Sequence, residues 1–286
     1  RLTRELVEKV DVIVFDIQDI GSRFYTYIYT LSDAMEDCAK LGVPVVVLDR
    51  MNPLGGAKTE GVVLEPRFSS FIGRYPIPAR HGMTAGEFAL LINDRYRIGC
   101  KLSVIPCSGW RRETMFTDTG RSWLNPSPNM PSEDCALLYC GTCSFESTNV
   151  SEGRGTTRPF EMIGAPYLDA RKLASGLEKR RLPGVCYRPC SFIPTFGKYT
   201  GELCHGVQCH VTDRKRINGF EVGMYLLHEI RENFPAFEIR SPGGMDCQMG
   251  TDSWRLGRES TEAFLQRARA ESAEFAAGIG KYQLYQ

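Results

Sequence analysis

Four polar clusters interrupt the apolar pattern of this chain, and each contains residue types that can do chemistry. The clusters span residues 16–23, 49–56, 80–82 and 146–158. They supply carboxylates for acid and base catalysis, together with arginines, amides, a histidine and aromatic rings. This inventory suits a sugar, because glycosidic cleavage uses paired carboxylates and a sugar ring packs on aromatic faces. The candidates in or beside the clusters are Asp16, Gln18, Asp19, Arg23, Tyr25, Asp49, Asn52, His81, Glu146, Glu152, Arg154 and Glu161.

Each cluster also has a purely structural interpretation. One of Asp16 and Asp19 could cap the helix that comes next, since acids are favoured at helix N-termini. Arg23 could be a partner of either acid, and Asp49 with Arg50 could form an internal ion pair. His81 could be a loop residue whose ring nitrogens hydrogen-bond within the protein. The loop around 152–161 could be a charged segment exposed to solvent. The glycines on either side of position 154 indicate that the backbone comes close to another part of the chain.

The elements that position these clusters alternate between strand and helix in the first half of the chain. Apolar runs predict strands at 12–15, 43–48 and 101–105, and helical spacing predicts helices at 31–41 and 84–92. The run 43–48 is apolar without interruption, which predicts burial on both faces of a parallel sheet. Ligands bind outside the carboxyl ends of such strands, and the polar clusters lie directly after the strands there.

Glycine and hydroxyl residues replace the apolar pattern in the segment SFESTNVSEGRGTTRPFE. We place a domain boundary there, between a wound α/β domain over 1–158 and a smaller α+β domain over 159–286. In the second domain, Asp169 and Asn218 are each predicted to cap a helix. Strands are predicted at 185–193 and 207–211, and a last helix at 259–277.

Composition excludes several classes of protein. The 286 residues carry a net charge of +1 without a long run of either sign, so we expect no nucleic-acid partner. No apolar stretch approaches the roughly 20 residues of a membrane span. The usual glycine-rich phosphate-binding motifs of NAD and ATP enzymes are absent, as are the serine-esterase elbow and the zincin motif.

The cysteine count is high for such a chain, at 11. The thiols are spread thinly, and Cys140 with Cys143 forms a lone C-x-x-C. Zinc sites need four ligands at suitable spacing, so we favour core packing over metal binding or redox chemistry. We therefore expect no metal site and no cofactor.

Seven sequence blocks, in order and over nearly the whole chain, resemble the NamZ-type exo-β-N-acetylmuramidases. They are FDIQDIGSRFYTYIYTL, VLDRMNPLGG, PIPARHGMTAGE, SPNMPS, TNVSEGRGTTRPFE, PTFGKYTGELCHGVQCHVTDR and KYQLY. The resemblance implies a Rossmann-like domain and an auxiliary domain, with the active cleft at their interface. It implies release of N-acetylmuramic acid from the non-reducing ends of peptidoglycan fragments in bacterial cell-wall turnover, without a metal or nucleotide. Family members usually carry a longer N-terminal stretch with a Pro-Glu-His-Gly motif, and we expect this chain to lack that stretch, which could hold a catalytic carboxylate.

Chemistry then suggests roles for the candidates. Glu152 is the first choice for acid and base catalysis because it lies in the glycine-rich loop at the predicted boundary, with Asp16, Asp19, Glu146 and Glu161 as alternatives. Arg23 and Arg154 could bind the lactyl carboxylate of muramic acid, which a bidentate guanidinium recognises well. The remaining candidates are expected to bind substrate: Asp16, Gln18, Asp49, Asn52, His81 and Glu161 through polar groups, and Tyr25 or Tyr27 through the ring.

Two rival functions remain open at this point. One is a non-catalytic protein that binds cell-wall sugars, and the other is an α/β hydrolase of a different acidic or phosphorylated sugar. Turnover of a muramic acid saccharide separates them. From the substrate we expect an extracytoplasmic location, periplasmic or secreted, rather than a cytoplasmic one, and the sequence leaves the oligomeric state open.

Overall fold

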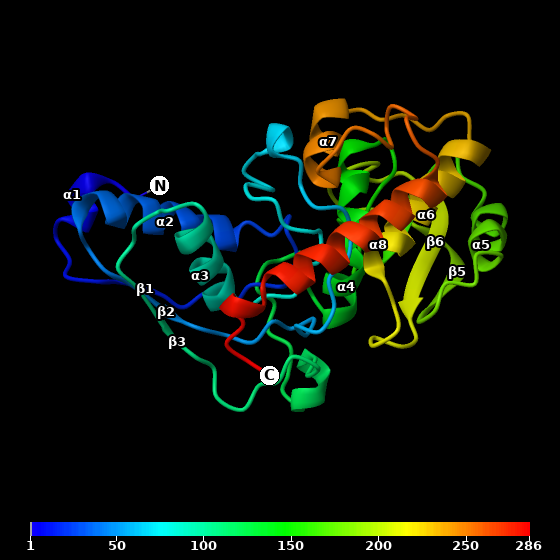
Figure 1. The fold of residues 1–286 in the computed structure, drawn as a ribbon. Coiled ribbons are helices and arrows are strands. Elements are labelled where there is room, and N and C mark those ends of the chain that lie inside the picture. Colours follow the sequence, from blue (N-terminus) through cyan, green and yellow to red (C-terminus); the bar gives the residue numbers. More distant parts are fainter. Residues whose placement is uncertain (1) are drawn as a thin grey trace.

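A three-stranded parallel sheet forms the first of two lobes in the computed structural model, which describes residues 2–286 (Figure 1). Its strands run in the order β1 (Ile13–Phe15), β2 (Val45–Leu48) and β3 (Leu102–Ile105). The helices of this lobe are α1 (Arg4–Val7), α2 (Tyr27–Leu41) and α3 (Ala85–Arg95). The predicted βαβ organisation is therefore confirmed.

Local signals define the helices of this lobe. Helix α2 ends at Gly42, which adopts the left-handed conformation of a C-cap. Thr84 and Glu87 form a reciprocal capping box at the start of α3. The N-cap of α2 is Thr26, so the alternative that Asp16 or Asp19 caps this helix is wrong. Asp19 accepts from the Gly21 amide and Asp16 contacts Arg50, so neither acid caps the helix.

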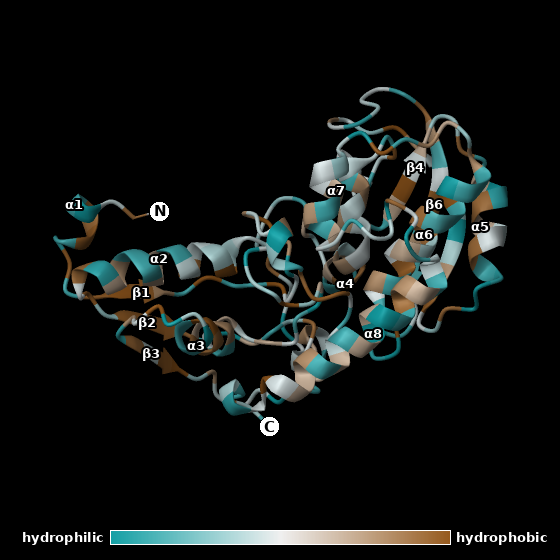
Figure 2. Cartoon of the chain, turned by 45° about the horizontal axis from the view of Figure 1, so that its top comes forward, coloured by the Kyte–Doolittle hydropathy of each residue, from teal (hydrophilic) through white to brown (hydrophobic). Residues whose placement is uncertain are grey.

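One face of the parallel sheet is covered by α2 and α3, whose apolar side chains pack with Phe15, Val45 and Val47. Figure 2 shows the apolar strands beside these two helices. The opposite face is partly open, and Leu48 and its partner Ile105 are 39% and 53% exposed. The expectation that the second strand is buried on both faces is therefore wrong at Leu48, because both helices pack on the same side.

The second lobe contains an antiparallel sheet in the order β4-β6-β5. Its strands are β4 (Met162–Ala165), β5 (Val185–Phe192) and β6 (Cys204–Val211), and its helices include α4 (Glu133–Thr142), α5 (Ala170–Glu178), α6 (Gly219–Asn233) and α7 (Pro242–Met249). Asp169 and Asn218 cap α5 and α6 as predicted. This lobe confirms the expected mixture of helices and antiparallel strands, while the boundary between 158 and 159 stays a prediction.

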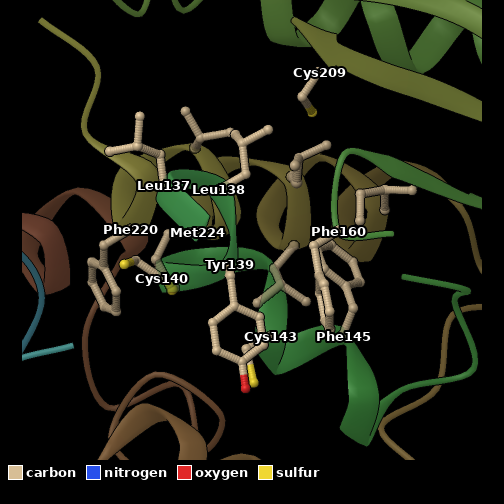
Figure 3. Close-up of a cluster of buried hydrophobic side chains, with 14 of the residues drawn as sticks. Leu137, Leu138, Tyr139, Cys140, Cys143, Phe145, Phe160, Cys209, Phe220 and Met224 are labelled. Carbon is tan, nitrogen blue, oxygen red and sulfur yellow. The ribbon is translucent and has the colours of Figure 1, made fainter. Parts of the chain in front are cut away.

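Helices α4 and α6 cross with their backbones in contact. A Cβ added to Gly219 would overlap the main chain of Leu137, and one added to Gly223 would overlap Gly141. Around this crossing, Leu137 and Tyr139 of α4 pack with Phe220 and Met224 of α6 in one buried cluster (Figure 3). This close crossing fixes α4 against α6 within the second lobe.

Helix α8 (Thr261–Gly278) runs from the second lobe back to the first (Figure 1). Single turns of 3-10 helix lie at η1 (Pro66–Phe68), η2 (Phe116–Thr119), η3 (Cys143–Ser147) and η4 (Gly280–Tyr282). The last residues bind the first lobe: the Tyr285 hydroxyl donates to Asp49 at 2.6 Å and the Leu284 amide to Glu87 at 2.9 Å. Across residues 2–286, none of the helices has the length and apolar character needed to cross a membrane.

Candidate active site

Two of the predicted carboxylates, Glu146 and Glu152, lie on either side of Arg154. The Arg154 guanidinium donates to Glu146 Oε1, and its Nε lies 3.6 Å from Glu152 Oε1. Lys198 Nζ donates to Glu152 Oε2 at 2.9 Å, and Gln248 Nε2 donates to Glu146 Oε2 at 3.1 Å. Two acids and two cations therefore form a charge-balanced group, which we call the carboxylate cluster.

The two glutamates of this cluster differ in access and environment. The Glu152 side chain is 7% exposed, and its two oxygens face Lys198 and Arg154. The Glu146 side chain is 30% exposed, and burial raises its pKa despite the nearby Arg154 guanidinium. A general acid needs a raised pKa and an oxygen that the substrate can reach. The geometry therefore favours Glu146 over Glu152 as the proton donor.

The loop that carries both glutamates is fixed by residues on either side. Lys198 also donates to the main-chain oxygens of Phe145 and Val150, at 2.6 and 3.0 Å. Gly153 and Gly155 have φ values of +80° and +81°, a conformation that side chains disfavour. A Cβ on Gly155 would overlap the main chain of Phe196, which confirms the predicted close approach at these glycines.

Two other candidates, Asp19 in the segment after β1 and His81, are buried next to each other. The Gly21 amide donates to Asp19 Oδ2 at 2.7 Å, and His81 Nε2 lies 3.4 Å from the same oxygen. The Met83 amide donates to His81 Nδ1 at 3.2 Å, so this geometry assigns the ring proton to Nε2, facing Asp19. Within residues 2–286, Asp19 Oδ1 has no hydrogen-bond partner. Asp19 is therefore held in a fixed orientation, and one of its two buried carboxylate oxygens makes no hydrogen bond within residues 2–286.

The Tyr139 ring of α4 contacts two other aromatic rings, one from the segment after β1 and one beside the carboxylate cluster. Its ring contacts Phe24, in the segment after Asp19, with centroids 6.1 Å apart, and Phe160, beneath Arg154, at 4.6 Å. Figure 3 shows the Tyr139 hydroxyl next to the sulfur of Cys143, one turn further along the chain. Helix α4 therefore packs both on the segment that follows β1 and on Phe160, which lies beneath Arg154.

Arg23 is placed away from any surface. Its side chain is fully buried, and its guanidinium donates to the carbonyl oxygens of Val62, Ile77 and Gln248 at 2.8, 2.7 and 2.9 Å. Burial lowers its pKa to about 10. This position fits a structural role, with carbonyl partners in place of the acids considered from the sequence. Arg154, whose side chain is 37% exposed, is the arginine that a ligand can reach.

Asp49 and Asn52 also bind the protein itself. Asp49 accepts from the Thr84 hydroxyl, the Gly86 amide and the Tyr285 hydroxyl, at 2.6, 2.8 and 2.6 Å. Asn52 donates to the Met83 carbonyl and accepts from the Leu54 amide, both at 2.9 Å. These bonds use the polar groups that were expected to meet a substrate.

Arg50 does not pair with Asp49 through its side chain. Its guanidinium contacts Asp16 at 2.7 Å near the surface, so the expected Asp49–Arg50 ion pair is wrong. Asp16 lies at the end of the adjacent parallel strand, which brings it within reach of Arg50.

The other predicted residues have local partners. Gln18 donates to the carbonyls of Asp19 and Met51. Tyr25 is buried edge-to-face against Tyr27, with centroids 4.7 Å apart. Glu161 is buried, accepts from Ser132, lies 3.5 Å from Arg158 and has a pKa raised by burial. No hydrogen bond or ion pair joins these three to the carboxylate cluster within the described part of the chain.

Lys198 and Gln248 are the site residues that the sequence reasoning did not single out. Lys198 lies in the block PTFGKYTGE, whose glycines and polar residues could have indicated a functional loop. The sequence around Gln248 contains no comparable pattern. Surface cavities of about 410 and 430 Å³ lie elsewhere, one beside α5 and α6 and one between α6 and α8, and no candidate lines either. Over residues 2–286, no group of three or more His, Cys, Asp or Glu residues is arranged to hold a metal ion, and the 11 cysteines are free thiols.

The carboxylates beside Arg154 are the residue types that glycoside hydrolases use for acid and base catalysis. The chain belongs to the exo-β-N-acetylmuramidase NamZ family. The family model of the NamZ N-terminal part matches residues 1–134, and that of the C-terminal part matches residues 137–285. The predicted family membership and glycosidase class are therefore confirmed.

Three related proteins agree with this assignment. The peptidoglycan β-N-acetylmuramidase NamZ of Bacillus subtilis (strain 168) is 44% identical over 287 residues, which cover 99% of this chain and 69% of that protein. A DUF1343 family protein from Bacteroides fragilis NCTC 9343 superposes with a TM-score of 0.93 at 33% identity, covering 99% of this chain and 77% of the other. A second protein of that family and organism gives 0.82 at 31% identity, covering 100% and 78%.

Proposed function

We propose that this chain hydrolyses the β-glycosidic bond of a terminal N-acetylmuramic acid and releases this sugar from the non-reducing ends of peptidoglycan fragments. The family membership and the Bacillus subtilis relative support this activity. The observation that carries it is the carboxylate cluster, in which a reachable glutamate with a raised pKa adjoins a partly exposed arginine.

In this proposal Glu146 donates a proton to the oxygen of the leaving sugar. Burial supplies the raised pKa that the acid form requires. Glu152 and Lys198 hold the loop in place. Asp19 is as buried as Glu152, with a side chain 7% exposed, so no role as the second carboxylate is assigned to it. Arg154 binds the lactyl carboxylate, because its side chain is 37% exposed and a guanidinium matches a planar carboxylate.

The test is the release of free N-acetylmuramic acid from a muramic acid-terminated disaccharide. Glu146→Gln should lower kcat by about 10²- to 10⁴-fold, the usual contribution of a general acid, and by more than Glu152→Gln does. Glu232→Gln is the matched control, since its side chain is 57% exposed on α6, and should leave activity unchanged. An unaffected Glu146→Gln variant would refute the assignment of the acid.

The rival functions give different results in the same assay. Binding of the disaccharide by a folded chain without release would favour the non-catalytic sugar-binding protein. Release from a phosphorylated sugar, with none from the muramic acid substrate, would favour the other hydrolase. Either outcome would refute the proposed activity.

We also propose that the chain acts outside the cytoplasm, because peptidoglycan lies there. Cell fractionation and then immunodetection check this location. Recovery of the chain in the cytoplasmic fraction alone would contradict it.

A further inference from the structure

The hairpin loop between β5 and β6 exposes large apolar side chains beside the carboxylate cluster. Ile193, Phe196 and Leu203 are 55%, 51% and 50% exposed. Phe192 pairs with Cys204 at the base of the hairpin, so Ile193 and Leu203 are the first and last residues of the loop. Phe196 is the aromatic residue among them and lies in the loop itself.

This loop is held firmly in place, so the exposure of Phe196 does not come from a loose segment. The amide and hydroxyl of Thr195 both donate to the Gly155 carbonyl at 2.9 Å. The Gly201 amide donates to the Pro194 carbonyl at 2.9 Å, which closes the loop on itself. The Tyr199 hydroxyl donates to the Asn149 carbonyl at 2.6 Å. These bonds fix the position of Phe196 relative to the loop that carries the two glutamates.

The two residues after Phe196 lie beside the carboxylate cluster. A Cβ built on Gly197 would lie 3.8 Å from Cβ of Arg154. Lys198 binds Glu152 directly at 2.9 Å. Phe196, which is 51% exposed, is therefore carried by a loop that lies directly beside the cluster.

We propose that Phe196 is the platform for the sugar on the leaving side of the cleaved bond, the sugar to which the terminal muramic acid is attached. An aromatic face binds the apolar face of a sugar ring, and a solvent-exposed ring on a fixed loop offers such a face. An enzyme that removes a terminal sugar holds that sugar among its catalytic groups and leaves the next one at the rim. This inference rests on the proposed function and adds the residue that recognises the sugar beyond the scissile bond.

Two substrates test the inference. The disaccharide of N-acetylmuramic acid and N-acetylglucosamine has a sugar on the leaving side, whereas N-acetylmuramyl β-fluoride has none. With the disaccharide, Phe196→Ala should lower kcat/KM by about 3- to 10-fold, mainly through a higher KM. Phe196→Tyr should keep near-normal kinetics, and all variants should hydrolyse the fluoride like the unmodified chain. Phe71→Ala is the control, since Phe71 is 63% exposed in the first lobe.

The outcomes separate this inference from the activity on which it rests. An unchanged kcat/KM of Phe196→Ala on the disaccharide overturns the platform while the proposed function stands. An equal loss on both substrates also overturns it, because the defect then does not depend on the second sugar. If the unmodified chain releases N-acetylmuramic acid from neither substrate, the proposed function fails and the platform fails with it.

Discussion

Replacing Lys198 by methionine removes the cation that holds the loop of Glu146 and Glu152. Lys198 is 20% exposed and donates to two carbonyl oxygens and to Glu152. The two carbonyl bonds contribute about 1 kcal/mol each, and a buried carboxylate that loses its cation costs about 1–3 kcal/mol more. We therefore expect Lys198→Met to lower the free energy of unfolding by about 3–5 kcal/mol.

A double-mutant cycle isolates the ionic part of this loss. Adding Glu152→Gln to Lys198→Met removes the carboxylate that has lost one of its two cations, so the two changes together should cost about 1–2 kcal/mol less than the sum of the single changes. Urea unfolding monitored by circular dichroism measures all of the variants. Lys215→Met is the control, because Lys215 is 67% exposed and pairs only at the surface with Asp118, so it should stay within about 0.5 kcal/mol.

Two results would refute this reasoning. A loss below about 1 kcal/mol for Lys198→Met would mean that the three bonds do not hold the loop. Strict additivity in the cycle would mean that Lys198 and Glu152 act independently, despite the 2.9 Å between them.

Three further predictions concern the proton donor, the C-terminal contact and the glycine-rich loop. Because burial raises the pKa of Glu146 and its protonated form is the proton donor, kcat/KM should hold at lower pH and fall as pH rises through this raised pKa; a profile without that upper limb would contradict the role. Tyr285→Phe removes the hydroxyl shared by Asp49 and the Cys107 amide and should cost about 1–3 kcal/mol in urea unfolding, so an unchanged midpoint would argue against the C-terminal contact. Gly155→Ala should cost more than about 2 kcal/mol, since its φ is +81° and the added Cβ meets the Phe196 main chain, whereas Gly243→Ala in α7, with open space around it, should cost nothing; equal effects would refute the close approach.

Sequence reasoning succeeded where the signal was local. The capping box from Thr84 to Glu87 spans four residues, and the left-handed Gly42 directly ends its helix, so neither depends on distant contacts. The glycines around Arg154 likewise indicated a close backbone approach. The parallel strands were also recognised, because their apolar runs and polar ends are local properties of the chain.

Sequence reasoning failed where a polar side chain takes its partner from far along the chain. Arg23 binds the carbonyl of Gln248, 225 residues away, and Asp49 binds Tyr285, 236 residues away. An arginine or aspartate at a strand end looks the same whether it faces a ligand or a distant carbonyl or hydroxyl. Only the folded chain distinguishes the two cases, and it does so through burial: Arg23 is fully enclosed, whereas Arg154 keeps an open side.

The contact between the C-terminal residues and the first lobe sets an order of events during synthesis. The parallel sheet is complete in sequence at Ile105, but Asp49 and Glu87 receive Tyr285 and Leu284 only roughly 180 residues later. At a ribosomal rate of about 5–20 residues per second, that interval is on the order of 10–40 s. During this time Asp49, at the end of the second strand, lacks the hydrogen bond from the Tyr285 hydroxyl. The first lobe therefore completes its contacts only after the second lobe has been synthesised.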